Sequence, residues 1–195
     1  MFVKICGLTE KAAIDAAVDA GADALGFVFA ESAREIAPER ARELCRDVPD
    51  RVIRVAVMRH PTPERFADVV ARFAPDWIQT DAEDFGALPV PAGLGRLPVY
   101  RDGAGAGGLP PRLLFEGELS GSGRTADWDE ARRIARQAEL VLAGGLDADN
   151  VAAAISYVRP FGVDVSSGVE AARGLKDPAR IREFVARVRA LEDDR

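Results

Sequence analysis

The sequence has few residues that are suited to binding a metal ion. Its 195 residues include two cysteines, Cys6 and Cys45, and a single histidine, His60. The cysteines show no metal-ligand spacing, and His60 stands beside Pro61 with no cysteine partner, so a structural zinc site is not expected. The low cysteine content suits a reducing cytoplasm.

Long hydrophobic runs and an excess of positive charge are also missing. No apolar stretch approaches the ~20 residues that a membrane span needs. The net charge of −6 argues against a surface for nucleic acid or for an anionic membrane. Residues 2–6 already read as a strand, so we expect no signal peptide. The expected partner is a small molecule, and the expected assembly is a monomer or a homodimer.

Apolar segments that read as strands alternate with helical patterns along the whole chain. With 48% hydrophobic residues, the chain can bury a sizeable core as one domain. Strands are predicted at residues 2–6, 24–29, 52–58, 76–79, 97–100, 112–115, 140–143 and 161–165. Helices are predicted at residues 10–20, 38–45, 62–73, 127–138 and 177–191, and another follows residue 147, with a weak helix at best over 82–88.

This alternation favours a parallel sheet that closes on itself. An open doubly wound sheet is the alternative, but no Gly-x-Gly-x-x-Gly motif follows the first strand. Residues 102–108 are too rich in glycine to hold the helix expected there, since glycine costs ~1 kcal/mol per position relative to alanine. We predict an α/β fold with a single domain over residues 1–195, a (β/α)8 TIM barrel with a truncated fifth helix.

Small residues end the seventh and eighth predicted strands. They are Gly144 and Gly145 in one loop and Ser166, Ser167 and Gly168 in the next. Bare backbone N–H groups at two adjacent strand ends suit a phosphate dianion, and barrels commonly bind phosphate on these two loops. For either loop alone, a tight turn that needs glycine for its geometry is the favoured explanation. The two together favour a phosphate site.

The first strand carries a candidate catalytic thiol. Lys4 and Cys6 share one face of this strand, so a barrel orientation puts Cys6 at the mouth with an ammonium below it. A nearby cation lowers the pKa of a thiol, which a nucleophile or a general base requires. An inert buried cysteine is the alternative. We also expect Asp164, on the neighbouring eighth strand, to pair with Lys4 inside the barrel.

Other charged residues follow the strand ends. Glu116 ends the sixth strand, across the mouth from Cys6, where it serves as an acid or is simply a solvated loop residue. Arg34 follows the second strand, and its planar fork suits a carboxylate, although a surface arginine is the plainer interpretation. Asp127 reads as a helix cap beside Trp128.

Six short blocks of the sequence occur together, in this order, in a known enzyme family. They are VKICGLT at 3–9, GADALGFVF at 21–29, GSGRTADW at 121–128, LAGGL at 142–146, VDVSSGVE at 163–170 and KD at 176–177. Each block alone is weakly specific. Together they cover nearly the whole chain, which resembles phosphoribosylanthranilate isomerase of tryptophan biosynthesis.

The resemblance implies a (β/α)8 barrel that performs an Amadori rearrangement without metal or organic cofactor. The reaction converts N-(5-phosphoribosyl)anthranilate to 1-(2-carboxyphenylamino)-1-deoxyribulose 5-phosphate. By motif, Cys6 matches the general base that removes the ribose C2 proton, and Arg34 matches the arginine that meets the anthranilate carboxylate. The phosphate cradle maps onto Gly144, Gly145, Ser166, Ser167 and Gly168.

The chain departs from the family pattern at two positions near the expected site. The family's general acid is an aspartate that ends the sixth strand, and Glu116 stands in its place with an arm longer by one methylene. After the fourth strand the family reads Gln-Leu-His-Gly, whereas this chain has Thr80 and Asp81 where the leucine and histidine stand. The sequence does not show whether Glu116, Glu118 or Asp127 delivers the proton.

These departures leave two alternatives to the isomerase. One is a related barrel isomerase or epimerase that acts on another sugar phosphate. The other is a barrel that binds a phosphometabolite without catalysis.

Overall fold

The strands form a closed parallel barrel. The computed structural model describes residues 1–101, 108–117 and 126–193, and within these residues eight parallel strands pair in sequence order, with the last against the first. The strands are β1 (Phe2–Cys6), β2 (Ala24–Val28), β3 (Ile53–Val57), β4 (Trp77–Asp81), β5 (Gly95–Arg101), β6 (Arg112–Glu116), β7 (Glu139–Leu142) and β8 (Gly162–Val165). The predicted barrel is therefore confirmed.

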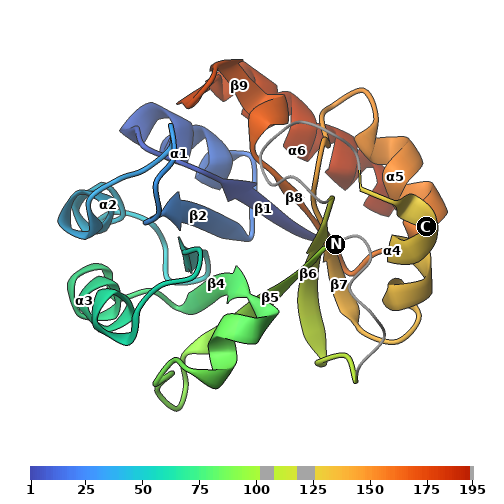
Figure 1. Cartoon of the computed structure of the whole chain (residues 1–195). Coiled ribbons are helices and arrows are strands. Elements are labelled where there is room, and N and C mark those ends of the chain that lie inside the picture. The colour runs from blue at the N-terminus through green and yellow to red at the C-terminus, as the bar shows by residue number, and fades with distance from the viewer. Residues whose placement is uncertain (102–107, 118–125, 194–195) are drawn as a thin grey trace.

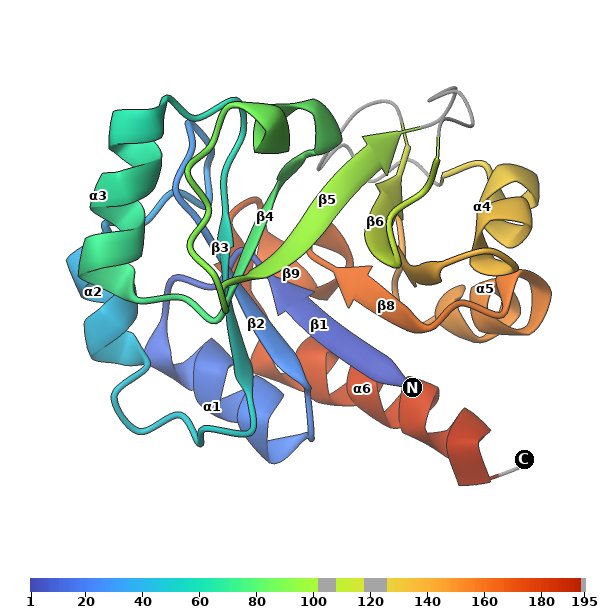
Figure 2. The same cartoon turned by 90° about the horizontal axis from the view of Figure 1, so that it is seen from below.

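Helices surround this barrel (Figure 1). They are α1 (Lys11–Asp19), α2 (Pro38–Leu44), α3 (Pro63–Phe73), α4 (Trp128–Ala135), α5 (Val151–Val158) and α6 (Pro178–Asp193). The last helix, α6, lies against α1 and α5, so the two ends of the chain pack together (Figure 2). In the part of the chain that the structure describes, no helix is long and apolar enough to cross a membrane.

Local sequence explains where these helices begin. Thr62 precedes α3, its side chain accepts a hydrogen bond from the Arg65 N–H at 3.2 Å, and Pro63 occupies the first turn. Asp127 caps α4 by accepting from the N–H groups of Asp129 at 2.9 Å and Glu130 at 3.1 Å. Asp127 is thus the helix cap that its sequence context predicted.

Alternation along the strands divides the core into two layers. One apolar cluster fills the barrel and consists of Phe2, Ala24, Val55, Leu97, Val99, Leu114, Val141 and Ala143. The other cluster lies between the strands and the helices, and includes Ile5, Leu25, Phe27, Phe115 and Phe184. Because successive strand residues face opposite ways, every second residue of each strand enters the barrel. The same alternation decides which charged side chains of the strands enter the barrel.

The structure differs from the predicted elements around the end of β4 and after β8. Strand β4 continues to Asp81, two residues beyond its predicted end, and η1 (Ala82–Gly86) is a 3-10 helix. The loop after β8 contains η2 (Ser167–Val169) and an antiparallel hairpin of β9 (Glu170–Ala172) and β10 (Leu175–Lys176), which sequence analysis did not predict. The shortened fifth crossover falls mostly at residues 102–107, outside the described residues.

Candidate active site

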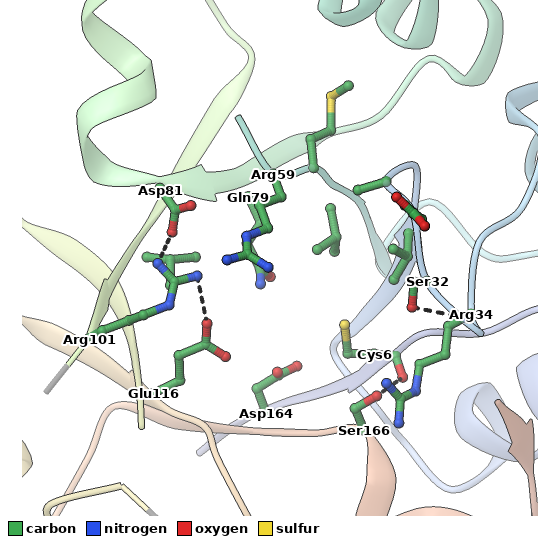
Figure 3. A pocket seen from close by; sticks show the side chains of 16 residues that line it. Cys6, Ser32, Arg34, Arg59, Gln79, Asp81, Arg101, Glu116, Asp164 and Ser166 are labelled. Atoms are coloured by element: carbon green, nitrogen blue, oxygen red, sulfur yellow. Dashed lines mark hydrogen bonds and ion pairs between the residues drawn. The ribbon is translucent and has the colours of Figure 1, made fainter. Parts of the chain in front are cut away.

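A pocket opens at the carboxyl ends of the barrel strands (Figure 3). Five of the predicted site residues line it, namely Cys6, Arg34, Glu116, Asp164 and Ser166. Cys6 on β1 and Glu116 on β6 face the same cavity, with Asp164 between them in the view of Figure 3. The barrel therefore brings the Cys6 thiol of β1 and the Glu116 carboxyl group of β6 into one pocket.

A buried ion pair lies beneath the thiol. The Lys4 Nζ atom is 2.7 Å from Asp164 Oδ1, and both side chains are almost fully removed from water. A Cβ atom placed on Gly26 would be 3.0 Å from both the Cys6 Sγ and the Lys4 Nζ, so both side chains point into the barrel over this glycine. The predicted pairing of Lys4 with Asp164 is confirmed, as is the ammonium below Cys6.

The electrostatics of the thiol differ from the sequence prediction. Burial raises the pKa of the Cys6 thiol, and the opposing attraction of the Lys4 ammonium is too weak to reverse the shift. The predicted lowering of the Cys6 pKa is therefore wrong, because position along a strand does not reveal how much water reaches the sulfur. Cys45 is a buried core residue as expected, and burial raises its pKa to about 12.

Arg34 enters the pocket as part of a second buried charge cluster. Its Nε and Nη2 atoms donate to the Glu170 carboxylate at 2.6 and 3.0 Å, and Lys176 Nζ donates to the same carboxylate at 2.8 Å. Burial raises the pKa of Glu170, but the hydrogen bonds from Arg34 and Lys176 outweigh it and lower the value to about 2. The β9–β10 hairpin therefore fixes the arginine.

This arrangement depends on Gly7, which sequence analysis did not single out. Gly7 has a φ of +77°, and a Cβ atom there would be 2.5 Å from Arg34 Cδ and 3.2 Å from Ser166 Oγ. A side chain at this position would therefore collide with Arg34.

The two predicted phosphate loops meet at one edge of the pocket. Gly144 and Gly145 both have positive φ, of 89° and 63°. A Cβ atom on Gly168 would be 2.0 Å from the Leu146 carbonyl oxygen, so the loops after β7 and β8 are in direct contact. Of the predicted phosphate-binding set, Ser166 lines the pocket. Its hydroxyl donates to the Cys6 carbonyl at 3.1 Å, a structural role that the sequence did not predict.

A charged network occupies the opposite side of the pocket. The Arg101 guanidinium contacts Asp81 through Nη1 and lies 3.1 Å from Glu116 Oε1 through Nη2. Glu116 is thus not a solvated loop residue, since 15% of its side chain is exposed and it bears an ion pair. Sequence analysis missed Arg101, although Asp81 and Arg101 are in phase with the inward-facing residues of β4 and β5.

Comparison with known proteins is consistent with this geometry. Residues 3–83 and 109–187 match the family model described as N-(5'phosphoribosyl)anthranilate (PRA) isomerase. The chain is 40% identical over 208 residues to the N-(5'-phosphoribosyl)anthranilate isomerase of Listeria monocytogenes serotype 4b, covering 98% of this chain and 100% of that protein.

Solved structures share the fold over nearly the whole chain. One is a phosphoribosyl anthranilate isomerase in complex with reduced 1-(o-carboxyphenylamino)-1-deoxyribulose 5-phosphate, with a TM-score of 0.80, 31% identity and coverage of 97% of this chain and 99% of that one. Another describes monomers generated from the dimeric enzyme of Thermotoga maritima, with a TM-score of 0.79, 32% identity and coverage of 97% and 99%.

Proposed function

The chain belongs to the N-(5'-phosphoribosyl)anthranilate isomerase family, and from this premise we propose which of its residues carry the reaction. The protein is an aldose–ketose isomerase of tryptophan biosynthesis. Its reaction is the Amadori rearrangement of N-(5'-phosphoribosyl)anthranilate to 1-(2-carboxyphenylamino)-1-deoxyribulose 5-phosphate. The residue assignments rest on one observation, the placement of Cys6 and Glu116 in a single pocket.

Glu116 acts first, as the general acid. Its protonated carboxyl group donates to the ribose ring oxygen, and the bond between this oxygen and C1 breaks. The electron pair on the anthranilate nitrogen forms a C1=N bond, which gives an open-chain iminium. The placement of Glu116 at the inward end of β6 supports this role over Asp127, which caps a helix.

Cys6 acts next, as the general base. Burial disfavours ionisation of Cys6, so the fraction of the thiol that is ionised beside the Lys4 ammonium removes the C2 proton. The electrons of that C–H bond form C1=C2, while those of C1=N return to nitrogen. The resulting enolamine takes a proton at C1 and loses the proton of its C2 hydroxyl, which leaves a ketone at C2. Carbon C1 is reduced and C2 is oxidised within one molecule, so the step balances without an external electron carrier.

The remaining site residues hold the substrate. Two nitrogen atoms of Arg34 bond Glu170, and its Nη1, which bonds none of the described residues, meets the anthranilate carboxylate. The phosphate is bound at the touching loops by Gly144, Gly145, Ser166, Ser167 and Gly168. Lys4 and Asp164 support the thiol from below. Phosphate binding anchors the substrate and supplies energy for the chemical step.

We also infer the context in which the protein works. One barrel domain over residues 1–195 is supported by the packing of α6 against α1. Two free, buried cysteines suit the reducing cytoplasm. We propose a small-molecule phosphosugar substrate, no nucleic-acid or membrane partner, and a monomer or a homodimer. Light scattering of the purified protein distinguishes the two assemblies.

A fluorescence assay of N-(5'-phosphoribosyl)anthranilate consumption tests the assignments. Cys6→Ala and Glu116→Gln should each lower kcat by about 10²- to 10⁴-fold, the usual range for a lost acid or base. The matched variants Cys45→Ala, in the core, and Glu183→Gln, on the exposed face of α6, should retain kcat. Full turnover by Cys6→Ala would remove the proposed base, and full turnover by Glu116→Gln would remove the proposed acid.

A further inference from the structure

The two departures from the family pattern, at positions 81 and 116, are joined by one guanidinium. Arg101 Nη1 pairs with Asp81, and Arg101 Nη2 lies 3.1 Å from Glu116 Oε1 (Figure 3). The structure thus connects residues that are 35 positions apart in the sequence. Neither sequence departure by itself indicated the other.

Strand register explains why these three side chains meet. Arg101 is the pairing partner of Glu116 between β5 and β6, and Asp81 pairs with Val99, which lies two residues before Arg101 on the same face. All three side chains therefore enter the barrel at its last layer, on three successive strands. Asp81 is 7% exposed at its side chain, Glu116 15% and Arg101 27%, so water reaches the guanidinium more than it reaches the two carboxyl groups.

Asp81 also lies within ion-pair distance of a histidine, although its Oδ2 atom accepts no hydrogen bond from the described residues. His60, in the loop after β3, places Nε2 3.2 Å from Asp81 Oδ2, and its Nδ1 is 3.0 Å from Asp84 Oδ1. The contacts run from His60 through Asp81 and Arg101 to Glu116, across the ends of β3, β4, β5 and β6. The Arg101 guanidinium therefore lies between two carboxyl groups, those of Asp81 and Glu116.

We propose that Arg101 is a positioning residue that, anchored by Asp81, holds the carboxyl group of Glu116 in place for proton transfer. This inference rests on the proposed role of Glu116 as the general acid. A glutamate has one more rotatable bond than the family's aspartate, so its carboxyl group samples more positions. Proton transfer needs a heavy-atom separation of about 2.6–3.2 Å, and a misplacement of about 1 Å can cost ~10²-fold in rate.

Asp81 also balances the positive charge that Arg101 brings next to Glu116. A lone arginine beside an acid favours the ionised form of that acid, which has no proton to donate. Here the Arg101 charge is shared with the Asp81 carboxylate, so the pair next to Glu116 has no net charge. The guanidinium can therefore orient the carboxyl group without acting on it as an unbalanced cation.

A double-mutant cycle between Arg101 and Glu116 tests the proposal. Arg101→Gln should lower kcat by about 10- to 100-fold while KM changes by less than about threefold, because the substrate is still bound but the acid is misplaced. Arg101→Lys should recover part of the lost kcat, since an ammonium can still bridge two carboxylates. Arg40→Gln, which breaks an exposed pair with Glu43 on α2, is the matched control and should leave both constants unchanged.

The shorter acid provides the second arm of the cycle. In Glu116→Asp the carboxyl group is drawn back from the guanidinium, so adding Arg101→Gln should reduce kcat by no more than about threefold further. Asp81→Asn should lower kcat in the same direction as Arg101→Gln, because the guanidinium loses its anchor. This variant keeps the proposal testable if Arg101→Gln does not fold.

Three outcomes would overturn the inference. In the first, Arg101→Gln has the kcat of the wild type. In the second, Arg101→Gln changes only KM. In the third, the variant with both Glu116→Asp and Arg101→Gln loses kcat by the product of the two single losses. Glu116→Gln separates this failure from a failure of the proposed function. If Glu116→Gln is inactive and Arg101→Gln is not impaired, only the positioning role is wrong, whereas an active Glu116→Gln removes the acid assignment itself.

Discussion

The charged side chains on the two sides of the barrel mouth differ in how much of their surface is exposed to water. On the thiol side, defined by Lys4, Cys6 and Asp164, the Lys4 side chain is 0% exposed and that of Asp164 is 8% exposed. On the acid side, defined by His60, Asp81, Arg101 and Glu116, exposure rises from 7% at Asp81 to 53% at His60.

This difference predicts which property each side controls. A charge that is buried with one partner has no water to replace that partner, so breaking the pair costs stability. A charge at a partly exposed edge is rehydrated when its partner is lost, so the main cost is in geometry and rate. The Lys4–Asp164 pair beneath the thiol should therefore govern folding, and the Asp81–Arg101 pair beside the acid should govern turnover.

The largest effect is expected from breaking the Lys4–Asp164 pair. Lys4→Met leaves a buried carboxylate without its cation and should lower the free energy of unfolding by about 3–5 kcal/mol in urea titrations at pH 7. Lys11→Met, which breaks the exposed pair with Asp15, should leave the free energy of unfolding nearly unchanged, because water screens this pair.

The double variant Lys4→Met with Asp164→Leu should recover much of this stability, because both charges are then gone. If Lys4→Met and Lys11→Met lowered the free energy of unfolding equally, the expected difference between buried and exposed charges would be contradicted.

A pH titration of stability sharpens the comparison through Glu170, next to the thiol side. Its pKa falls from 4.5 to about 2 in the folded protein, so its stabilising contribution is complete above pH 4.5 and disappears as the pH falls toward 2. Glu170→Gln should be less stable than the wild type by roughly 3 kcal/mol at pH 7, and this gap should close between pH 4.5 and 2.

Urea unfolding at several pH values measures this gap. The exposed Glu183→Gln serves as the control and should stay parallel to the wild type throughout. A gap for Glu170→Gln that is independent of pH would contradict the assignment of the low pKa to its pairs with Arg34 and Lys176.

The smallest effect is expected at the exposed end of the acid side. The hydrogen bond to Asp84 raises the pKa of His60, so its stabilising contribution is complete below 6.5 and is lost as the pH rises through the higher folded-state value. His60→Asn should cost less than about 1 kcal/mol at pH 5.5, because water screens this pair, and less still at pH 9. A larger loss at pH 9 than at pH 5.5 would reverse the sign and reject the assignment.

Sequence reasoning identified the residues whose chemistry is evident from their position at a strand end. Cys6 and Glu116 each occur where an apolar run stops, and alternation correctly oriented Lys4 and Asp164 toward each other. It did not identify Arg101, because β4 and β5 were predicted too short and their inward-facing ends were counted as loop. The hairpin that carries Glu170 and Lys176 was missed because its strands are only two and three residues long.

The sequence by itself determined the barrel and its order of strands, since periodicity and glycine placement are local properties that the chain displays directly, and its resemblance to a family named the candidate acid and base. Only the tertiary structure decided the ionisation of Cys6 and the partners of Arg34 and Glu116. Those properties depend on how much water reaches an atom and on which side chains approach it from distant strands. Both are consequences of closing the sheet, which no local pattern encodes.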